Sequence, residues 1–305
     1  MDLKFLNKKV SLSVFLGSLF GVAALVYSLG YKMAMDRFND VVSYVQEKQK
    51  MYSGLSELDH NIRSEYISDI PESDVLTSLC KGYISGLNDS SCGFWGKDEY
   101  NEYQENEKKL KPAVEYKKLD ETMAYIKCES LINNASSNVI DKINSMIVSG
   151  FSDLIMDLRN CQKSDIEEIF KILKHIIPSG DIVNVVDSKG RTETACASTS
   201  TGVNLNFAVL VNEKTSGGAE VLASALKDSK NAKVVGVKTA GNPVRVKKVI
   251  LSDDSVLVFS DAYYVTKSGN NILKKGLTPD VVVKLSDGED NQLQKAIDLL
   301  NESKD

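Results

Sequence analysis

A strand–turn–helix–strand pattern in the second half of the chain constrains the fold more than any other stretch. Phe207–Val211 is an unbroken apolar run of strand-forming residues, typical of a strand buried on both faces. A small, polar turn at Asn212–Ala219 leads into Glu220–Leu226, which has apolar residues at helical spacing, and Val234–Val237 is a second apolar run. This order predicts a βαβ unit of an α/β fold. Its turn exposes backbone N–H groups at a helix N-terminus, where α/β enzymes hold a nucleophile or an oxyanion site.

The turn resembles that of the carboxyl-terminal processing peptidases, also called tail-specific proteases, which are Ser–Lys enzymes. The family pattern is Val-Asn-x-x-(Ser/Thr)-Ala-Ser-Ala-(Ser/Ala)-Glu, and residues 211–220 read Val-Asn-Glu-Lys-Thr-Ser-Gly-Gly-Ala-Glu. The resemblance places Gly217 at the position of the nucleophilic Ser. The family's Gly-Lys-Gly-x-Val-Gln segment corresponds to Gly-Asn-Pro-Val-Arg-Val at residues 241–246. Asn242 therefore stands at the position of the general-base Lys, and Val246 at that of the Gln that orients it.

A third catalytic element of the family is also altered. Asp153–Asn160 reads as a buried strand with polar residues at its end, and in the family this strand leads into Asn-Pro-Gly-Gly. Those glycines let a backbone N–H point into the oxyanion hole. This chain has Cys161-Gln162-Lys163-Ser164 instead.

The resemblance covers most of residues 55–300. It implies a tail-specific protease core, built of crotonase-like βαβ units, that follows an N-terminal helical region in the sequence. Lys111-Pro112 leads almost directly to Ala124–Cys128, which resembles the first core strand, so there is no room for the family's PDZ domain. The predicted organisation is a cytoplasmic N-terminus at 1–9, a transmembrane signal anchor at 10–31, a helical region at 32–111 and a peptidase-like α/β core at 112–305.

The segment Val10–Tyr31 contains no charged residue, and about 20 such residues cross a bilayer as a helix. Its long apolar core and the poor cleavage site at residues 32–35 favour a retained signal anchor over a cleaved signal peptide. Three lysines precede the span (Lys4, Lys8 and Lys9), whereas two basic residues follow it closely (Lys32 and Arg37). This bias predicts that the N-terminus lies inside the membrane-bounded compartment and the rest of the chain outside. We therefore expect a single-pass membrane protein, and the resemblance implies a bacterial cell envelope.

Outside the central unit, periodicity predicts further helices and strands. Met35–Ser64 is expected to form two helices, the first of them a stalk or a dimer contact. The other predicted helices are Ser73–Leu87, Lys97–Lys111, Asn138–Val148, Asp165–Ile177 and Asp290–Leu300. A hairpin is expected around Gly190, and three strands at Lys247–Leu251, Val256–Ser260 and Ala262–Thr266.

The composition argues against nucleic-acid, metal and cofactor binding. The net charge of −5 argues against nucleic acid as a partner. The five cysteines form no CxxC pair and the two histidines lie far apart, so we expect neither a metal nor a cofactor, and the thiols are expected to be buried or idle.

A Ser–Lys peptidase needs a hydroxyl nucleophile and a lysine that accepts its proton. Glycine and asparagine supply neither, so the sequence favours a pseudopeptidase. It would bind extended peptides outside the membrane by strand addition, or pair with an active peptidase paralogue or another membrane protein. One alternative is an active enzyme with Ser216 as a displaced nucleophile and Lys238, Lys247 or another lysine as base, although Ser216 also fits a helix N-cap or turn residue. Another alternative is a purely structural membrane-anchored module.

Overall fold

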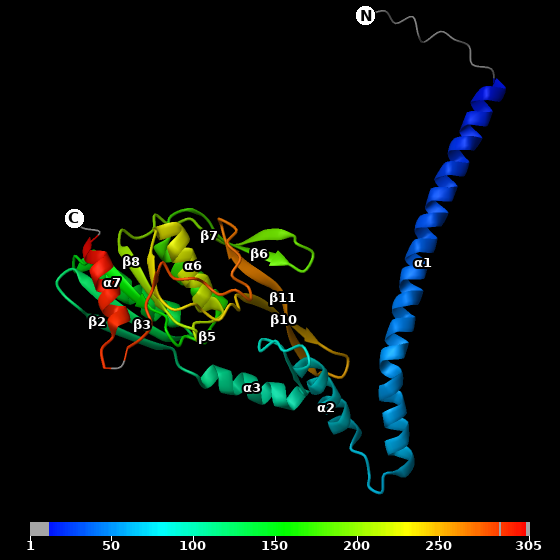
Figure 1. Cartoon of the computed structure of the whole chain (residues 1–305), viewed down its shortest axis with the longest axis horizontal. Coiled ribbons are helices and arrows are strands. Elements are labelled where there is room, and N and C mark those ends of the chain that lie inside the picture. Colours follow the sequence, from blue (N-terminus) through cyan, green and yellow to red (C-terminus); the bar gives the residue numbers. More distant parts are fainter. Residues whose placement is uncertain (1–11, 287, 303–305) are drawn as a thin grey trace, which may run out of the picture. The chain divides into compact units, whose positions relative to one another are not determined.

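The computed structural model describes residues 12–286 and 288–302, so the predicted cytoplasmic segment 1–9 lies outside the described residues. The chain divides into two compact units, the first ending at Glu72 and the second beginning at Ser73. The domain boundaries at residues 31 and 111 stay predictions. The α/β class is confirmed by the second unit, which has helices packed on a largely parallel sheet (Figure 1).

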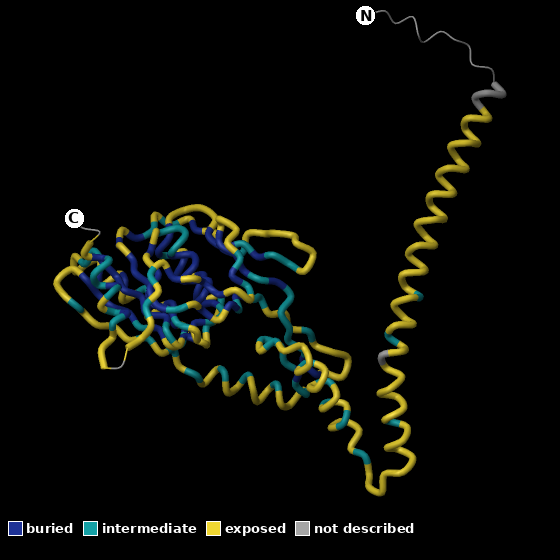
Figure 2. The backbone as a smooth tube through the Cα atoms, viewed as in Figure 1, coloured by how far each residue is buried: buried dark blue, intermediate teal, exposed yellow. Residues whose placement is uncertain are grey.

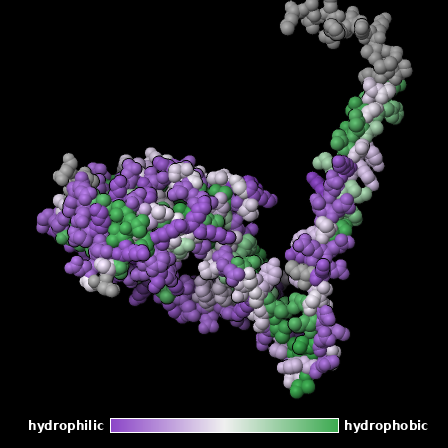
Figure 3. All heavy atoms as spheres, viewed as in Figure 1, coloured by the Kyte–Doolittle hydropathy of each residue, from purple (hydrophilic) through white to green (hydrophobic). Residues whose placement is uncertain are grey.

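The first unit is dominated by one continuous helix, α1 (Leu12–Glu65). The prediction of two helices within Met35–Ser64 is therefore wrong. Gly54 is the strongest helix breaker in that stretch, but a single glycine costs a helix only about 1 kcal/mol. Among the described helices α1 alone is long and apolar enough to cross a membrane, a criterion that a signal sequence also meets. Figure 3 shows green, apolar residues on its upper part, and Figure 2 shows the helix exposed along nearly its whole length.

The second unit contains a seven-stranded sheet with the order β12-β9-β8-β4-β3-β2, in which β5 pairs with β3. All pairs are parallel except β2 with β3. The strands are β2 (Ala113–Lys118), β3 (Met123–Leu131), β4 (Asp153–Asp157), β5 (Lys163–Ser164), β8 (Asn206–Val211), β9 (Lys233–Gly236) and β12 (Val281–Val282).

A second, antiparallel sheet has the order β1-β11-β6-β7, with β10 on the other edge of β11. Its strands are β1 (Gly93–Trp95), β6 (Gly180–Asp187), β7 (Thr192–Ser198), β10 (Val244–Ile250) and β11 (Val256–Thr266). The helices of this unit are α2 (Glu72–Ser85), α3 (Lys97–Lys109), α4 (Ala135–Val148), α5 (Ile166–Ile176), α6 (Gly218–Lys230) and α7 (Asn291–Glu302).

The central parallel strands are buried on both faces, as their unbroken apolar runs predict; every residue of β4 is buried. Alternate side chains of the sheet pack on one side against α4, α5 and α6, forming the larger core. The remaining side chains face α7, where Tyr125, Ile155, Leu210 and Val235 meet Ala296 and Leu300. Figure 2 shows this buried interior in dark blue.

Most predicted elements of the second unit are confirmed, and one is corrected. Val256–Ser260 and Ala262–Thr266 are one continuous strand, β11, rather than two. Asp261 interrupts the apolar pattern, but its carboxylate is neutralised by two hydrogen bonds of 2.9 Å from Arg245 on β10. The strand therefore continues through a position that looks like a break in the sequence.

Helix α4 is capped by another helix rather than by its own sequence. Its N-cap residue, Asn134, has φ 67° and makes no side-chain cap. Glu168 on α5, 4% exposed, instead accepts hydrogen bonds from the Ser136 backbone N–H (2.8 Å) and hydroxyl (2.7 Å). This carboxylate satisfies one of the free N–H groups at the helix start and fixes α4 against α5.

Replacing Glu168 with alanine is expected to lower the free energy of unfolding by about 2 kcal/mol, because both Ser136 donors lose their acceptor. Urea unfolding of the purified chain measures this change. The control is Glu167→Ala, which alters the exposed neighbour on the same turn and should change the value by less than about 0.5 kcal/mol. Equal effects of the two substitutions would contradict the capping role.

Candidate functional site

The buried carboxylate of Glu220 gathers the residues that the sequence singled out. Glu220 lies in the first turn of α6 and is 0% exposed. One oxygen accepts hydrogen bonds from the Thr239 hydroxyl and from the Gly241 N–H at 2.6 Å. The other accepts from the Asn242 N–H at 2.7 Å and the Gly217 N–H at 3.2 Å. The predicted nucleophile and base positions thus meet at one oxygen atom, although they belong to different loops.

Gly217, the expected nucleophile position, lies in a sharp strand-to-helix turn. It follows β8 as the N-cap of α6, with φ 63° and ψ −127°, a conformation that strains any residue other than glycine. Sharp strand-to-helix turns with strained backbones are the places where α/β hydrolases present a serine. A Cβ at this position would meet only the Ser164 Oγ, at 3.6 Å. A side chain would therefore fit here, at a cost in backbone strain.

Ser164 closes the N-terminus of α6 beside Gly217. Its hydroxyl accepts a hydrogen bond from the Ala219 N–H at 3.2 Å and donates one to the Ser216 carbonyl at 3.5 Å. Ser164 stands where the family pattern has its second glycine, so the side chain occupies space that the glycine would leave open. The Ala219 N–H at the start of α6 is thus bonded within the protein.

Ser216, the alternative nucleophile, is a half-buried turn residue; the N-cap of α6 is Gly217. Its backbone N–H donates to the Cys161 carbonyl at 3.1 Å. Within the described part of the chain its hydroxyl has no hydrogen-bond partner, and neither Lys238 nor Lys247 is bonded to it. A base for this serine must come within about 3 Å. Its role as a nucleophile stays a prediction.

The side chains of Asn242 and Val246 lie in different environments. The Asn242 side chain donates to the Ser91 hydroxyl at 2.8 Å and lines a pocket of about 580 Å³ together with Asp89, Phe259 and Tyr263. Val246 lies on β10 opposite Ser260, is 52% exposed, and stands outside the Glu220 cluster. An apolar side chain there cannot hold a lysine by a hydrogen bond.

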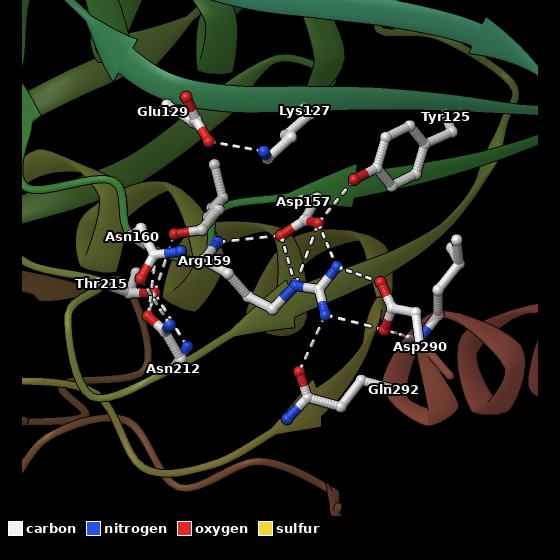
Figure 4. A network of polar contacts seen from close by, with 12 residues as sticks. Tyr125, Lys127, Glu129, Asp157, Arg159, Asn160, Asn212, Thr215, Asp290 and Gln292 are labelled. Carbon is white, nitrogen blue, oxygen red and sulfur yellow. Dashed lines mark hydrogen bonds and ion pairs between the residues drawn. The ribbon is translucent and has the colours of Figure 1, made fainter. Parts of the chain in front are cut away.

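A second polar network, missed by the sequence analysis, anchors the strand that leads to Ser164 (Figure 4). The Arg159 guanidinium lies between Asp157, which is buried at the end of β4, and Asp290 at the start of α7, with N–O distances of 2.5 and 2.7 Å. Tyr125 donates to Asp157 at 2.7 Å, and burial together with this carboxylate raises the pKa of Tyr125. Hydrogen bonding to Arg159 lowers the pKa of Asp290.

An asparagine pair ties the ends of β4 and β8 together (Figure 4). The Asn212 amide oxygen accepts from the Asn160 N–H at 2.9 Å, and the Asn212 amide nitrogen donates to the Asn160 oxygen at 3.0 Å. Thr215 completes the link by donating to the Leu158 carbonyl at 2.8 Å. These contacts hold the two loops that carry Ser164 and Gly217 at a fixed separation.

The cysteines near the site are inert. Burial raises the pKa of Cys161 to about 12 and that of Cys128 well above its ordinary value, so neither forms a thiolate at neutral pH. Over residues 12–286 and 288–302 no group of three or more His, Cys, Asp or Glu side chains is placed to hold a metal ion.

Comparisons with known proteins agree with this geometry. The sequence model described as "Peptidase family S41" matches residues 122–283. The carboxyl-terminal-processing protease of Synechocystis sp. is 30% identical over 188 residues, which cover 59% of this chain and 44% of that protein. The chloroplastic carboxyl-terminal-processing peptidase 2 of Arabidopsis thaliana is 34% identical over 160 residues, covering 52% and 31%. The chain thus spans less than half the length of these two relatives.

Solved structures share the fold. The photosystem II D1 C-terminal processing protease superposes with a TM-score of 0.51 and 26% identity, over 56% of this chain and 48% of that one. A lipoprotein from Streptococcus agalactiae superposes with a TM-score of 0.62 over 78% of this chain and 84% of its own; at 19% identity this likeness shows the fold alone.

Replacing Glu220 with glutamine is expected to lower the free energy of unfolding by about 3 kcal/mol, because an amide NH₂ would face donors that now meet a carboxylate. Urea unfolding measures this change in the free energy of unfolding. Glu213→Gln, an exposed change in the same turn, is the control and should stay within about 0.5 kcal/mol of wild type. A Glu220→Gln protein as stable as this control would show that the cluster does not depend on the charge.

Asp290 gives a prediction of pH dependence. Its folded pKa lies below its unfolded one, so its contribution to stability is complete above the ordinary Asp pKa and disappears as the pH falls through the folded value. The stability difference between wild type and Asp290→Asn should be constant between about pH 7 and pH 5 and shrink below about pH 4. In an Arg159→Gln background the same substitution should show a smaller dependence, because only the backbone N–H donors to Asp290, such as that of Leu293, remain. An equally large dependence in that background would contradict the role of Arg159.

Proposed function

This chain belongs to peptidase family S41, and we propose that it is a membrane-anchored member that binds extended peptide segments without cleaving them. The observation that carries the proposal is the Glu220 cluster, which holds Gly217 and Asn242 in place while neither supplies chemistry. Loss of the nucleophile alone costs a serine protease about a million-fold in kcat. Here the positions of the nucleophile, the base, the residue that orients the base and the oxyanion glycines are all changed.

The closed N-terminus of α6 supports the same proposal. An acyl-transfer site needs free N–H donors aimed at the developing oxyanion. The Ala219 N–H donates to Ser164, and the Gly217 N–H donates to Glu220. A substrate carbonyl that accepted from either of these two N–H groups would have to displace an internal acceptor.

A free sheet edge supports binding of an extended peptide. Within the described chain β10 pairs only with β11, so its other edge offers unpaired backbone groups directly after Asn242. Val246 and Ile250 are 52% and 63% exposed and, as alternate residues with Lys248 between them, share one face of the strand. A peptide that adds as a strand would bond to this edge and cover both side chains.

Anchoring is proposed from α1 and its charges. The uncharged segment Val10–Tyr31, with more lysines before it than basic residues after it, supports a single-pass helix with the second unit outside the membrane. Curated relatives from bacteria support a bacterial protein, and with the membrane anchor we place it in the cell envelope. Pairing with an active peptidase paralogue is a further use of the same non-cleaving site.

The first test is labelling of the detergent-purified full-length protein with a fluorophosphonate probe, together with casein cleavage. We expect neither labelling nor cleavage in a sample shown to be folded by circular dichroism. The alternative that Ser216 acts as a nucleophile is favoured by its unbonded hydroxyl, and Ser216→Ala is its control. Labelling and cleavage that are lost in Ser216→Ala would overturn the proposal and make the protein an active serine peptidase.

Binding is tested separately with immobilised, unfolded casein. Val246→Glu with Ile250→Glu should weaken retention of the full-length protein roughly tenfold, because two apolar contacts are lost. Val282→Glu, at a 65% exposed position on β12 of the other sheet, is the matched control and should leave retention unchanged. Loss of retention in both variants would show a nonspecific charge effect and contradict the assignment of β10.

A further inference from the structure

Helix α1 carries an apolar stripe that no described residue of the first unit buries. After the uncharged span, apolar or aromatic residues recur at alternating steps of three and four, interrupted by Lys48 and Asp59. The stripe consists of Tyr31, Ala34, Phe38, Val41, Val45, Tyr52, Leu55 and Ile62. Its large side chains are between 39% and 62% exposed, and no described residue from Leu16 to Glu65 is buried. A water-exposed helix depends on burial of such a face for most of its stability.

The spacing of this stripe identifies the kind of partner. Steps of three and four average 3.5 residues, which is the coiled-coil repeat and not the 3.6 residues of a straight helix. A stripe with this period winds slowly around the helix, so only another helix that winds with it can cover its whole length. The surface of a globular domain would cover one or two turns.

We propose that α1 forms a parallel, two-stranded coiled coil with α1 of a second copy of this chain. The stripe is self-complementary, because in an in-register pair each of its residues meets its own counterpart, apolar against apolar. Identical copies most often associate as two-fold dimers. This interaction does not depend on whether the second unit cleaves or binds peptides.

The two polar positions in the stripe are compatible with this pairing. Asp59 accepts a hydrogen bond from Arg63 of the same helix at 2.8 Å, which offsets the repulsion between two Asp59 side chains. The Lys48 ammonium lies 5.6 Å from the centre of the Tyr44 ring, beside the stripe, so its stem can pack while its charge stays in water.

In the uncharged span one of the two stripe positions carries small residues, whereas the other carries the aromatic residues Phe20 and Tyr27. Gly17 and Ala24 occupy the same heptad position as Tyr31 and Phe38, and Gly21 lies next to it with GxxxG spacing. A Cβ added to Gly17 or Gly21 would meet no atom within 4 Å, so the packing of this chain does not require either glycine. Small residues allow two helices to approach closely along the same face.

Cysteine cross-linking of the full-length protein in membranes tests the pairing. The two partly accessible cysteines, Cys80 and Cys92, are first changed to serine; Cys128, Cys161 and Cys196 are buried. Leu55→Cys in the stripe should give disulfide-linked dimers on mild oxidation. Glu57→Cys, on the opposite side of the same turn, should give at least about tenfold fewer. Equal cross-linking at both positions, or none at Leu55→Cys, would overturn the proposal.

Mass measurement provides a second test. Size-exclusion chromatography with light scattering should show a dimer for the wild-type protein in detergent and a monomer for Val45→Asp. Gln46→Asp, which changes the next residue outside the stripe, should remain a dimer. Thermal unfolding of the second unit should be the same in all three proteins. A monomeric wild type would overturn the proposal and indicate that a different protein covers the stripe. A trimer or tetramer would overturn the two-stranded form.

Discussion

The site depends on one buried charge. A carboxylate in a dry interior is tolerated only when hydrogen-bond donors replace water, and Glu220 receives three backbone N–H groups and one hydroxyl. These donors come from the turn after β8 and from the loop after β9. The carboxylate therefore fixes the relative positions of two loops that the sheet alone would leave independent. This structural role does not depend on the residue types at Gly217 and Asn242, which the family resemblance places at the nucleophile and base positions, because both donate through their backbone N–H groups.

The residues that differ from the family pattern at positions 217 and 164 also lower the strain of the turn before α6. A serine at position 217 would sit in a backbone conformation that costs about 1–3 kcal/mol for any residue with a Cβ, and glycine removes that strain. Ser164 fills part of the space beside it and accepts a hydrogen bond from the Ala219 N–H, which also donates to the Ser216 carbonyl at 3.3 Å. At position 164 the open space of a family glycine is thus exchanged for an ordinary internal contact. The result is a more stable turn that keeps the family backbone.

The two units meet different physical demands. The second unit buries its apolar residues on both faces of the parallel sheet, so its fold is complete within one chain. The described residues of the first unit do not bury the apolar face of α1 among themselves, so this face is available to a bilayer or another helix. Self-association through α1 would join two copies of the second unit, each with its proposed peptide-binding edge. A polypeptide with two binding segments would then be held more tightly than either site alone can achieve.

The sequence determined what depends on local pattern. Unbroken apolar runs and helical spacing identified the βαβ unit, and the resemblance placed Gly217, Asn242 and Val246 at the positions of the missing catalytic groups, because these signals lie within short stretches of chain. The continuity of α1 and of β11 was missed, since a single Gly54 or Asp261 looks like a break until its surroundings are known. Only the tertiary structure decided that Ser164 lies beside Gly217 and that Arg159 reaches Asp290. Those contacts join segments far apart in the sequence, and the order and register of the sheet, which no local pattern specifies, bring them together.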